Sequence, residues 1–235
     1  MKRYEYDWFN PLLAKWRQSR GELPWTGPTV EEKSTLPLLF EPGTSFRYSG
    51  GPDWAGKLLE RLTGTTLEKF MAEKIFTPLA IKDITFYPND REDMLNRLAT
   101  VSTLTETGEP PAIDAATFDP LFGGKDCLGG GGAYGSANAY FTFLHAVLRR
   151  DARLLTPASY DELFRPQLDA TCKKAFNAYL RSSPAHAQYL GMSLPSEIEK
   201  TWNFAGMICE EEEEEDAGWD VLLGWGAEYV LGEFS

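Results

Sequence analysis

The 235-residue sequence has no long apolar run and few of the residues that build metal or disulfide sites. No window approaches the roughly 18 consecutive apolar residues of a membrane-spanning helix, and the N-terminus MKRYEYDWFN lacks the apolar core of a signal peptide. The three cysteines, Cys127, Cys172 and Cys209, are far apart, and only two histidines occur. We therefore expect a cytoplasmic protein with reduced thiols and without a zinc site, a metal cofactor or a membrane contact.

Basic residues are also few, since 23 Lys and Arg stand against 35 Asp and Glu, which gives a formal net charge of -12. No basic face with interleaved aromatic residues is visible, so we do not expect nucleic acid as a partner. Seven of the acids form one run from Glu210 to Asp216, and without them the charge changes from -12 to -5. Like charges in a row repel one another and favour solvent, so we interpret residues 209–218 as a flexible acidic loop.

Helical patterns are well represented in the sequence. Residues 53–62 carry Trp54, Leu58, Leu59 and Leu62 at three- and four-residue spacing, and Gly64 follows as a stop. This spacing predicts an amphipathic helix.

Three further helix starts carry capping residues. Thr65 with Glu68 three positions later predicts a capping box for a helix that ends at Pro78, and Ser136 can cap a helix with an apolar stripe through Phe141 and Leu148. Thr156-Pro157 opens a shorter one. Strand signals are short, at residues 36–40, 83–87 and 221–223. We therefore expect a mainly helical chain with little sheet.

Four consecutive glycines precede Ser136 in the stretch LGGGGAYG, Leu128 to Gly135. A phosphate-binding loop would need a lysine and a spacing that are absent here. We interpret the run as a place where backbone approaches backbone, or a ligand, so closely that a Cβ atom would clash.

The stretch from Pro37 to Pro88 resembles the serine β-lactamase-like family of esterases and transesterases. The resemblance rests on the E-P-G-T turn at Glu41, the tyrosine at Tyr48, the D-W-A-G helix start at Asp53 and the T-G stop at Gly64. It extends to the segments Leu128 to Arg150 and Leu154 to Leu168. The likeness is strongest to a fungal branch that includes an acyltransferase of lovastatin-type polyketide biosynthesis.

The resemblance implies an α/β (α+β) fold of the β-lactamase/transpeptidase type, here mostly the helical subdomain plus part of the antiparallel sheet. It also implies serine acyl transfer from a small-molecule thioester or ester to an alcohol or water, without a cofactor. Tyr48 matches the family's proton-transferring tyrosine, in the sequence Tyr48-Ser49-Gly50. Ser49 and Gly50 would lie on the substrate side, and Trp225 with Gly226 matches a third motif near the oxyanion or acceptor side.

The nucleophile motif of that family, S-x-x-K, does not occur in this sequence. We expect that the chain is a single incomplete domain over residues 1–235, which begins after the family's nucleophile and stops before its last strands, and that it is inactive alone. A non-catalytic remnant or interaction module on the same scaffold, and a poorly folding fragment, stay open as alternatives. His145 and His186 are interpreted as structural, and no protein partner is indicated.

Overall fold

The structure is a computed structural model that describes residues 10–105, 110–115, 119, 121, 123–182, 184–189 and 194–210. Contacts divide the chain into two compact units. The first comprises Met1–Pro24, Thr35–Gly50 and Arg150–Gly226, and the second comprises Trp25–Ser34, Gly51–Arg149 and Ala227–Ser235. The expectation of a single incomplete domain with a flexible loop at residues 209–218 stays a prediction.

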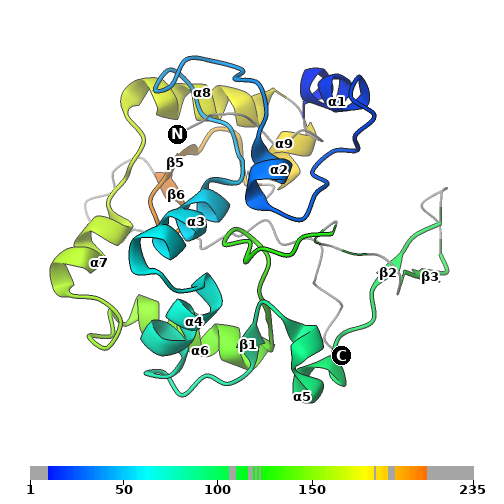
Figure 1. The fold of residues 1–235 in the computed structure, drawn as a ribbon. Coiled ribbons are helices and arrows are strands. Elements are labelled where there is room, and N and C mark those ends of the chain that lie inside the picture. The colour runs from blue at the N-terminus through cyan, green and yellow to red at the C-terminus, as the bar shows by residue number, and fades with distance from the viewer. Residues whose placement is uncertain are drawn as a thin grey trace. The chain divides into compact units, whose positions relative to one another are not determined.

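The first unit combines helices with one antiparallel hairpin (Figure 1). Its elements are α1 Pro11–Gln18, α7 Pro157–Phe164, α8 Ala170–Arg181, α9 Pro184–Tyr189, β5 Glu199–Trp202 and β6 Met207–Glu210. Asn10, Thr156 and Asp169 begin α1, α7 and α8 with side-chain oxygens that accept backbone N–H groups. Such caps satisfy donors that the first helical turn leaves unpaired.

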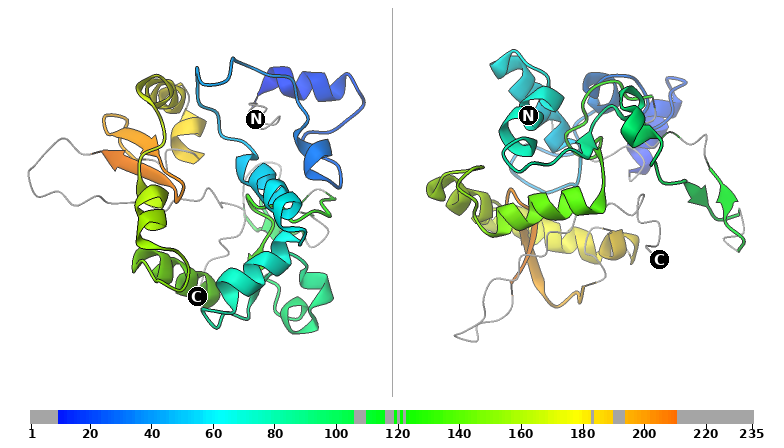
Figure 2. Two further views of the ribbon diagram at one scale, coloured as in Figure 1. Left: turned by 60° about the vertical axis from the view of Figure 1, so that its left-hand side comes forward. Right: turned by 90° about the horizontal axis from the view of Figure 1, so that it is seen from below.

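The hairpin of the first unit is fixed at its turn and along β5. Asn203 Oδ1 accepts the N–H groups of Ala205 and Gly206 at 2.8 and 2.7 Å, which closes the turn between β5 and β6. On α8, Asn177 exchanges two hydrogen bonds with the backbone of Lys200, at 2.7 and 2.9 Å. Both views of Figure 2 place the hairpin beside α8. The buried side of this unit therefore forms between a helix and a strand that are joined by hydrogen bonds.

The second unit is built from short elements. Its elements are α2 Val30–Ser34, α3 Gly51–Thr63, α4 Leu67–Met71, the π-helical turn Ala72–Phe76, β1 Ile84–Thr85, the 3₁₀ turn Pro88–Asp90, α5 Glu92–Leu95, β2 Ser102–Thr103, β3 Ile113–Asp114, β4 Tyr134–Gly135 and α6 Ala137–Leu148. β1 pairs with β4 and β2 pairs with β3, both antiparallel. Leu67, Phe86 and Cys127 form its buried apolar cluster. The expected helical chain with small sheets is therefore confirmed.

The helix starts predicted at Ser136 and Thr156 are confirmed, because each side chain accepts a backbone N–H three residues on. The helix cap predicted at Thr65 lies one residue too early in the sequence. Thr66, not Thr65, caps α4 by accepting the Lys69 N–H at 3.3 Å. The Glu68 carboxylate instead accepts the Thr85 hydroxyl and the Phe86 N–H at 2.8 and 2.7 Å, because β1 offers it these donors. A tertiary contact therefore replaces the expected capping box.

The buried face of α3 differs from the prediction. Leu58 and Leu62 are 55% and 76% exposed, whereas Asp53 is 2% exposed. Gly56 is also buried, and a methyl group there would lie 2.9 Å from Leu67 Cδ2. Leu59 of the predicted stripe does pack against the cluster of Leu67, Phe86 and Cys127, so the packed side of α3 combines this leucine with the small and polar residues.

Two of the strand predictions are wrong or shortened. Residues 36–40 are irregular, although Leu36 packs with Leu13 in a small buried cluster of the first unit. Only Ile84 and Thr85 of residues 83–87 form a strand. Residues 221–223 lie outside the described part of the chain. Short apolar runs without alternation carry no register, so packing alone decides their conformation.

Candidate active-site segment

The E-P-G-T turn that precedes Tyr48 is formed as its residue types require. The Thr44 N–H and hydroxyl both donate to the Glu41 carbonyl, at 3.2 and 2.7 Å. Gly43 has a φ of +87°, which glycine adopts without the steric cost that a side chain brings. With proline before this glycine, the geometry is that of a turn in which Pro and Gly occupy the two central positions.

The chain that leaves this turn is anchored on α8. The buried Cys172 thiol lies 3.4 Å from the Gly43 carbonyl oxygen and 3.7 Å from that of Ser45. The ring of Phe46 packs on that of Phe176, with centroids 4.6 Å apart. These contacts hold residues 43–46 against one face of the helix.

Arg47 and Tyr48 extend this anchored segment. The Arg47 guanidinium lies 4.5 Å from the centre of the Tyr179 ring and donates to the Phe46 carbonyl at 2.7 Å. The half-buried Tyr48 ring packs against the Trp202 indole, with centroids 6.3 Å apart and planes inclined at 46°. Tyr48 is therefore placed by aromatic packing within the first unit.

Trp202 is the neighbour of Tyr48 that the sequence reasoning missed. It ends β5, and its carbonyl accepts the Gln167 N–H at 2.7 Å. Its indole also stacks on Phe46 at 6.0 Å and meets the edge of Phe176 at 6.1 Å. The segment around Trp202 forms both strands of an antiparallel hairpin, which the strand signals of the sequence do not include. No local sequence signal connects Trp202 with Tyr48.

The structure describes two of the other four predicted site residues. Ser49 is half-buried and Gly50 is buried, directly before the start of α3. Trp225 and Gly226 lie outside the described residues, as does most of the acidic run from Glu210 to Asp216. The roles assigned to all four positions stay predictions.

The glycine run is explained by close packing in the second unit. A methyl group at Gly129 would lie 2.6 Å from the Pro52 carbonyl oxygen, and one at Gly132 would lie 2.9 Å from Leu128 Cβ. The Gly130 N–H donates to Asp53 Oδ1 at 2.8 Å. The close approach of Pro52 and Leu128 therefore explains the glycines at positions 129 and 132, whereas a methyl group at Gly131 would meet open space.

Asp53 and Lys200 are buried ionisable groups, one in each unit. Burial raises the pKa of Asp53, against the opposing effects of the Gly130 N–H and the Lys33 charge. Burial lowers the pKa of Lys200, whose ammonium donates to the carbonyls of Pro195 and Ile198 at 2.7 and 2.9 Å. Both side chains bind backbone groups of their own unit, so we assign them structural roles.

One serine and one histidine lie within hydrogen-bond distance, at 2.9 Å between Ser182 Oγ and His186 Nδ1. The Ser182 hydroxyl has one hydrogen and lies 2.6 Å from the Tyr179 carbonyl oxygen, which can only accept it. The imidazole nitrogen therefore donates to the serine oxygen, which is the wrong direction for a base that activates a nucleophile. This geometry agrees with a structural role for His186.

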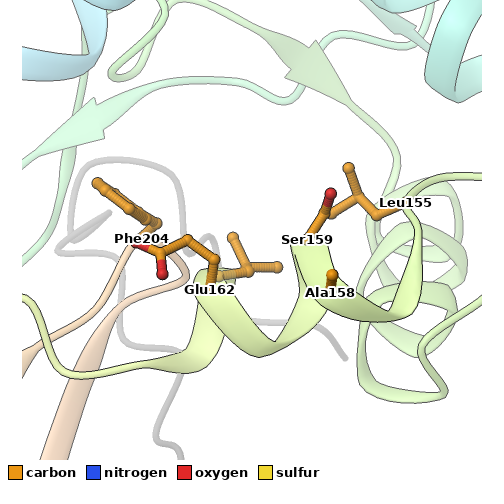
Figure 3. A pocket seen from close by; sticks show the side chains of 6 residues that line it. Leu155, Ala158, Ser159, Glu162 and Phe204 are labelled. Atoms are coloured by element: carbon orange, nitrogen blue, oxygen red, sulfur yellow. The ribbon is translucent and has the colours of Figure 1, made fainter.

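An apolar groove of about 500 Å³ lies along α7 in the first unit. Leu155, Ala158, Ser159 and Glu162 line it from α7 and the residues before it, and Phe204 approaches from the β5–β6 turn (Figure 3). Neither Tyr48 nor Trp202 contributes to its lining. The groove is therefore separate from the contacts that place Tyr48.

Within the described residues, no cluster of His, Cys, Asp and Glu could hold a metal ion. In the same part of the chain, none of the helices has the length and apolar character needed to cross a membrane. The arrangement around Tyr48 thus offers a phenol on an aromatic platform, without a metal centre among the residues that the structure describes.

Comparison with known proteins identifies the family to which the chain belongs. The sequence model of the Beta-lactamase family matches residues 6–179, which is most of the chain, so the chain belongs to this family. Its fold is of the β-lactamase/transpeptidase type, as expected from the sequence.

Particular relatives are fungal acyltransferases and an esterase. Lovastatin esterase of Penicillium rubens is 34% identical over 238 residues, which cover 97% of this chain and 57% of the relative. Monacolin J acid methylbutanoyltransferase of Aspergillus terreus is 31% identical and covers 88% of this chain and 49% of its own length. A LovD6 mutant of simvastatin synthase from Aspergillus terreus superposes with a TM-score of 0.73 at 33% identity, over 87% of this chain and 47% of that structure.

The chain thus spans about half the length of the relatives that it matches. Those relatives are acyltransferases and an esterase of the β-lactamase fold, which confirms the resemblance stated from the E-P-G-T turn and the segments around it. The chain is therefore a β-lactamase-related protein.

Proposed function

We propose that this chain carries the tyrosine side of a serine acyl-transfer site. In the proposed reaction a serine oxygen attacks the carbonyl of a small-molecule thioester or ester, and the proton of the serine passes by way of Tyr48 and a lysine to the leaving thiolate or alkoxide. An alcohol or water then attacks the acyl-serine and restores the serine hydroxyl. Ser49, Gly50, Trp225 and Gly226 are proposed to lie on the substrate and oxyanion side.

The observation that supports this function is the placement of Tyr48. It follows the glycine turn at the position expected for the family's tyrosine, and its ring is held by Trp202 in the aromatic cluster. The S-x-x-K motif does not occur in the 235 residues, so we propose that residues outside this sequence supply the serine and the lysine. The chain alone is then inactive. We propose a cytoplasmic location.

The test begins with the source DNA upstream of the coding sequence, read for an in-frame S-x-x-K. The extended protein and the 235-residue chain are then assayed with a p-nitrophenyl ester. We expect ester hydrolysis by the extended protein alone, and a fall in kcat of about 10²- to 10⁴-fold on Tyr48→Phe, the range for loss of a general acid–base group.

Three outcomes contradict parts of this proposal. A Tyr48-dependent rate in the 235-residue chain would show that it contains its own nucleophile. Full activity of the extended Tyr48→Phe variant would remove the proton-transfer role. An upstream sequence without S-x-x-K would favour the alternative function, a non-catalytic interaction module on the same scaffold.

A further inference from the structure

Trp202, an aromatic neighbour of Tyr48, is itself fixed from several sides. β5 is tied to α8 through the two hydrogen bonds between Asn177 and the Lys200 backbone. Trp202, two residues further on, is paired with Met207 of β6, and its carbonyl accepts the Gln167 N–H. The indole is therefore attached to a backbone that strand pairing and a helix hold in place.

The Trp202 indole contributes its ring and not its N–H group. Nε1 is buried and has no hydrogen-bond partner among the described residues. A buried N–H without an acceptor is unfavourable by about 1–3 kcal/mol, which a phenyl ring at this position would not incur. What the indole adds over a phenyl ring is contact area, and that area meets Phe46, Phe176 and Tyr48 together.

Phe46 and Tyr48 lie two residues apart in a segment without regular secondary structure, and both rings pack on Trp202. The single indole thus contacts both residues that flank Arg47, while the Arg47 guanidinium lies over the rings of Phe40 and Tyr179.

We infer that Trp202 is a positioning residue for Tyr48. Its indole, held by the contacts between β5 and α8, keeps the phenol ring in one orientation. This inference rests on the proposed function, because the orientation of the phenol matters only where its oxygen transfers a proton. A tyrosine that shares proton transfer must reach its partner at about 2.6–3.2 Å, so a freely rotating side chain would lose the geometry.

The test uses the 235-residue chain with ¹³C-labelled tyrosine, in which the Tyr48 signals are assigned by their loss in Tyr48→Phe. The readout is the ring order parameter of Tyr48 from ¹³C relaxation. We expect Trp202→Leu to lower this order parameter to below about 0.6, the range of flexible groups. Trp202→Phe, which keeps an aromatic ring, should retain most of the order.

Phe176→Leu is the matched control, because it removes a buried ring of the same cluster that contacts Phe46 and Trp202. An unchanged Tyr48 ring in Trp202→Leu, or an equal change in Phe176→Leu, would overturn the positioning role. If Trp202→Leu does not fold, Trp202→Met takes its place, and a Tyr48 ring that is as ordered in Trp202→Met as in the wild type would overturn the role as well. Failure of the proposed function shows in the esterase assay and leaves these signals unchanged, so the two failures are distinguishable.

Discussion

Replacement of Asp53 by asparagine should stabilise the chain at neutral pH, although it removes a charge from the first turn of a helix. The Asp53 side chain is 2% exposed, and its Oδ1 accepts the Gly130 N–H at 2.8 Å. Burial raises the pKa of this carboxyl, so the folded state disfavours the carboxylate relative to the unfolded chain. An amide has the same shape, keeps the acceptor for Gly130 and carries no charge.

The sign of the pH dependence follows from this pKa. Below about pH 4, the ordinary pKa of an aspartate, Asp53 is protonated in both states and costs nothing. As the pH rises, the unfolded chain releases its proton first, so the stability present at low pH is lost until the pH passes the raised pKa of the folded state. Each unit of pKa difference corresponds to about 1.4 kcal/mol, and Asp53→Asn removes this loss.

The hydrogen bond to Gly130 opposes burial. A hydrogen bond to a charged group is worth about 1.5–3 kcal/mol and one between neutral groups about 0.5–1.5, so this bond favours the carboxylate by about 1 kcal/mol, and the pKa of Asp53 is raised in spite of it. Asp53→Ala leaves the Gly130 N–H without this acceptor and should cost about 1–3 kcal/mol at every pH. The two variants therefore separate the acceptor from the charge.

The assay is urea unfolding of the wild type, Asp53→Asn and Asp53→Ala at pH 4.5 and 7.5. The free energy of unfolding of Asp53→Asn relative to the wild type should increase between the two pH values, and the Asp53→Ala deficit should persist at both. Hydrogen exchange of the Gly130 amide gives a local measure that does not depend on how the two units unfold. A loss of stability in Asp53→Asn that is larger at pH 7.5 would refute the reasoning, since it would show that Lys33 outweighs burial.

Two further substitutions test the packing contacts. Gly129→Ala should destabilise the chain by about 1–3 kcal/mol in thermal unfolding, because its methyl group meets the Pro52 carbonyl. Gly131→Ala, with open space around the new methyl group, should change stability by less than about 1 kcal/mol. Equal effects of the two substitutions would contradict the steric explanation. Asn177→Ala should lower the free energy of unfolding in urea by about 2–4 kcal/mol, because the Lys200 backbone loses both its hydrogen-bond donor and its acceptor on α8. Asn138→Ala, on the exposed side of α6, should have little effect. A small loss of stability in Asn177→Ala would show that water replaces these hydrogen bonds.

Local chemistry accounts for what the sequence predicted well. Ser136 and Thr156 cap helices because their hydroxyls act on N–H groups three residues away, and the E-P-G-T turn depends on one glycine at positive φ. Glu68 shows where this reasoning ends. Its carboxylate satisfied the pattern of a capping box, yet it binds Thr85 and Phe86, and no property of residues 65–68 distinguishes the two outcomes.

The surroundings of Tyr48 could not be derived from the sequence either, because they also depend on contacts between distant segments. Trp202 and Phe176 reach the segment from a strand and a helix far along the chain, and the placement of Trp202 depends on a hairpin that the strand signals of the sequence do not include. Leu58 and Leu62 had the spacing of a buried stripe but are exposed, because Asp53 and Gly56 occupy the packed side of α3. Helical periodicity identified the helix, whereas its orientation depended on contacts with other segments.

The packing around Tyr48 also decides which substitution can reveal its chemistry. The ring contact with Trp202, together with the packing of Phe46 on Phe176, gives the segment a structural role whether or not any proton is transferred. A substitution that removes the Tyr48 ring therefore mixes loss of packing with loss of chemistry. Tyr48→Phe keeps the ring and removes only the oxygen, so a rate that falls while the unfolding free energy stays within about 1 kcal/mol can be assigned to the phenol itself.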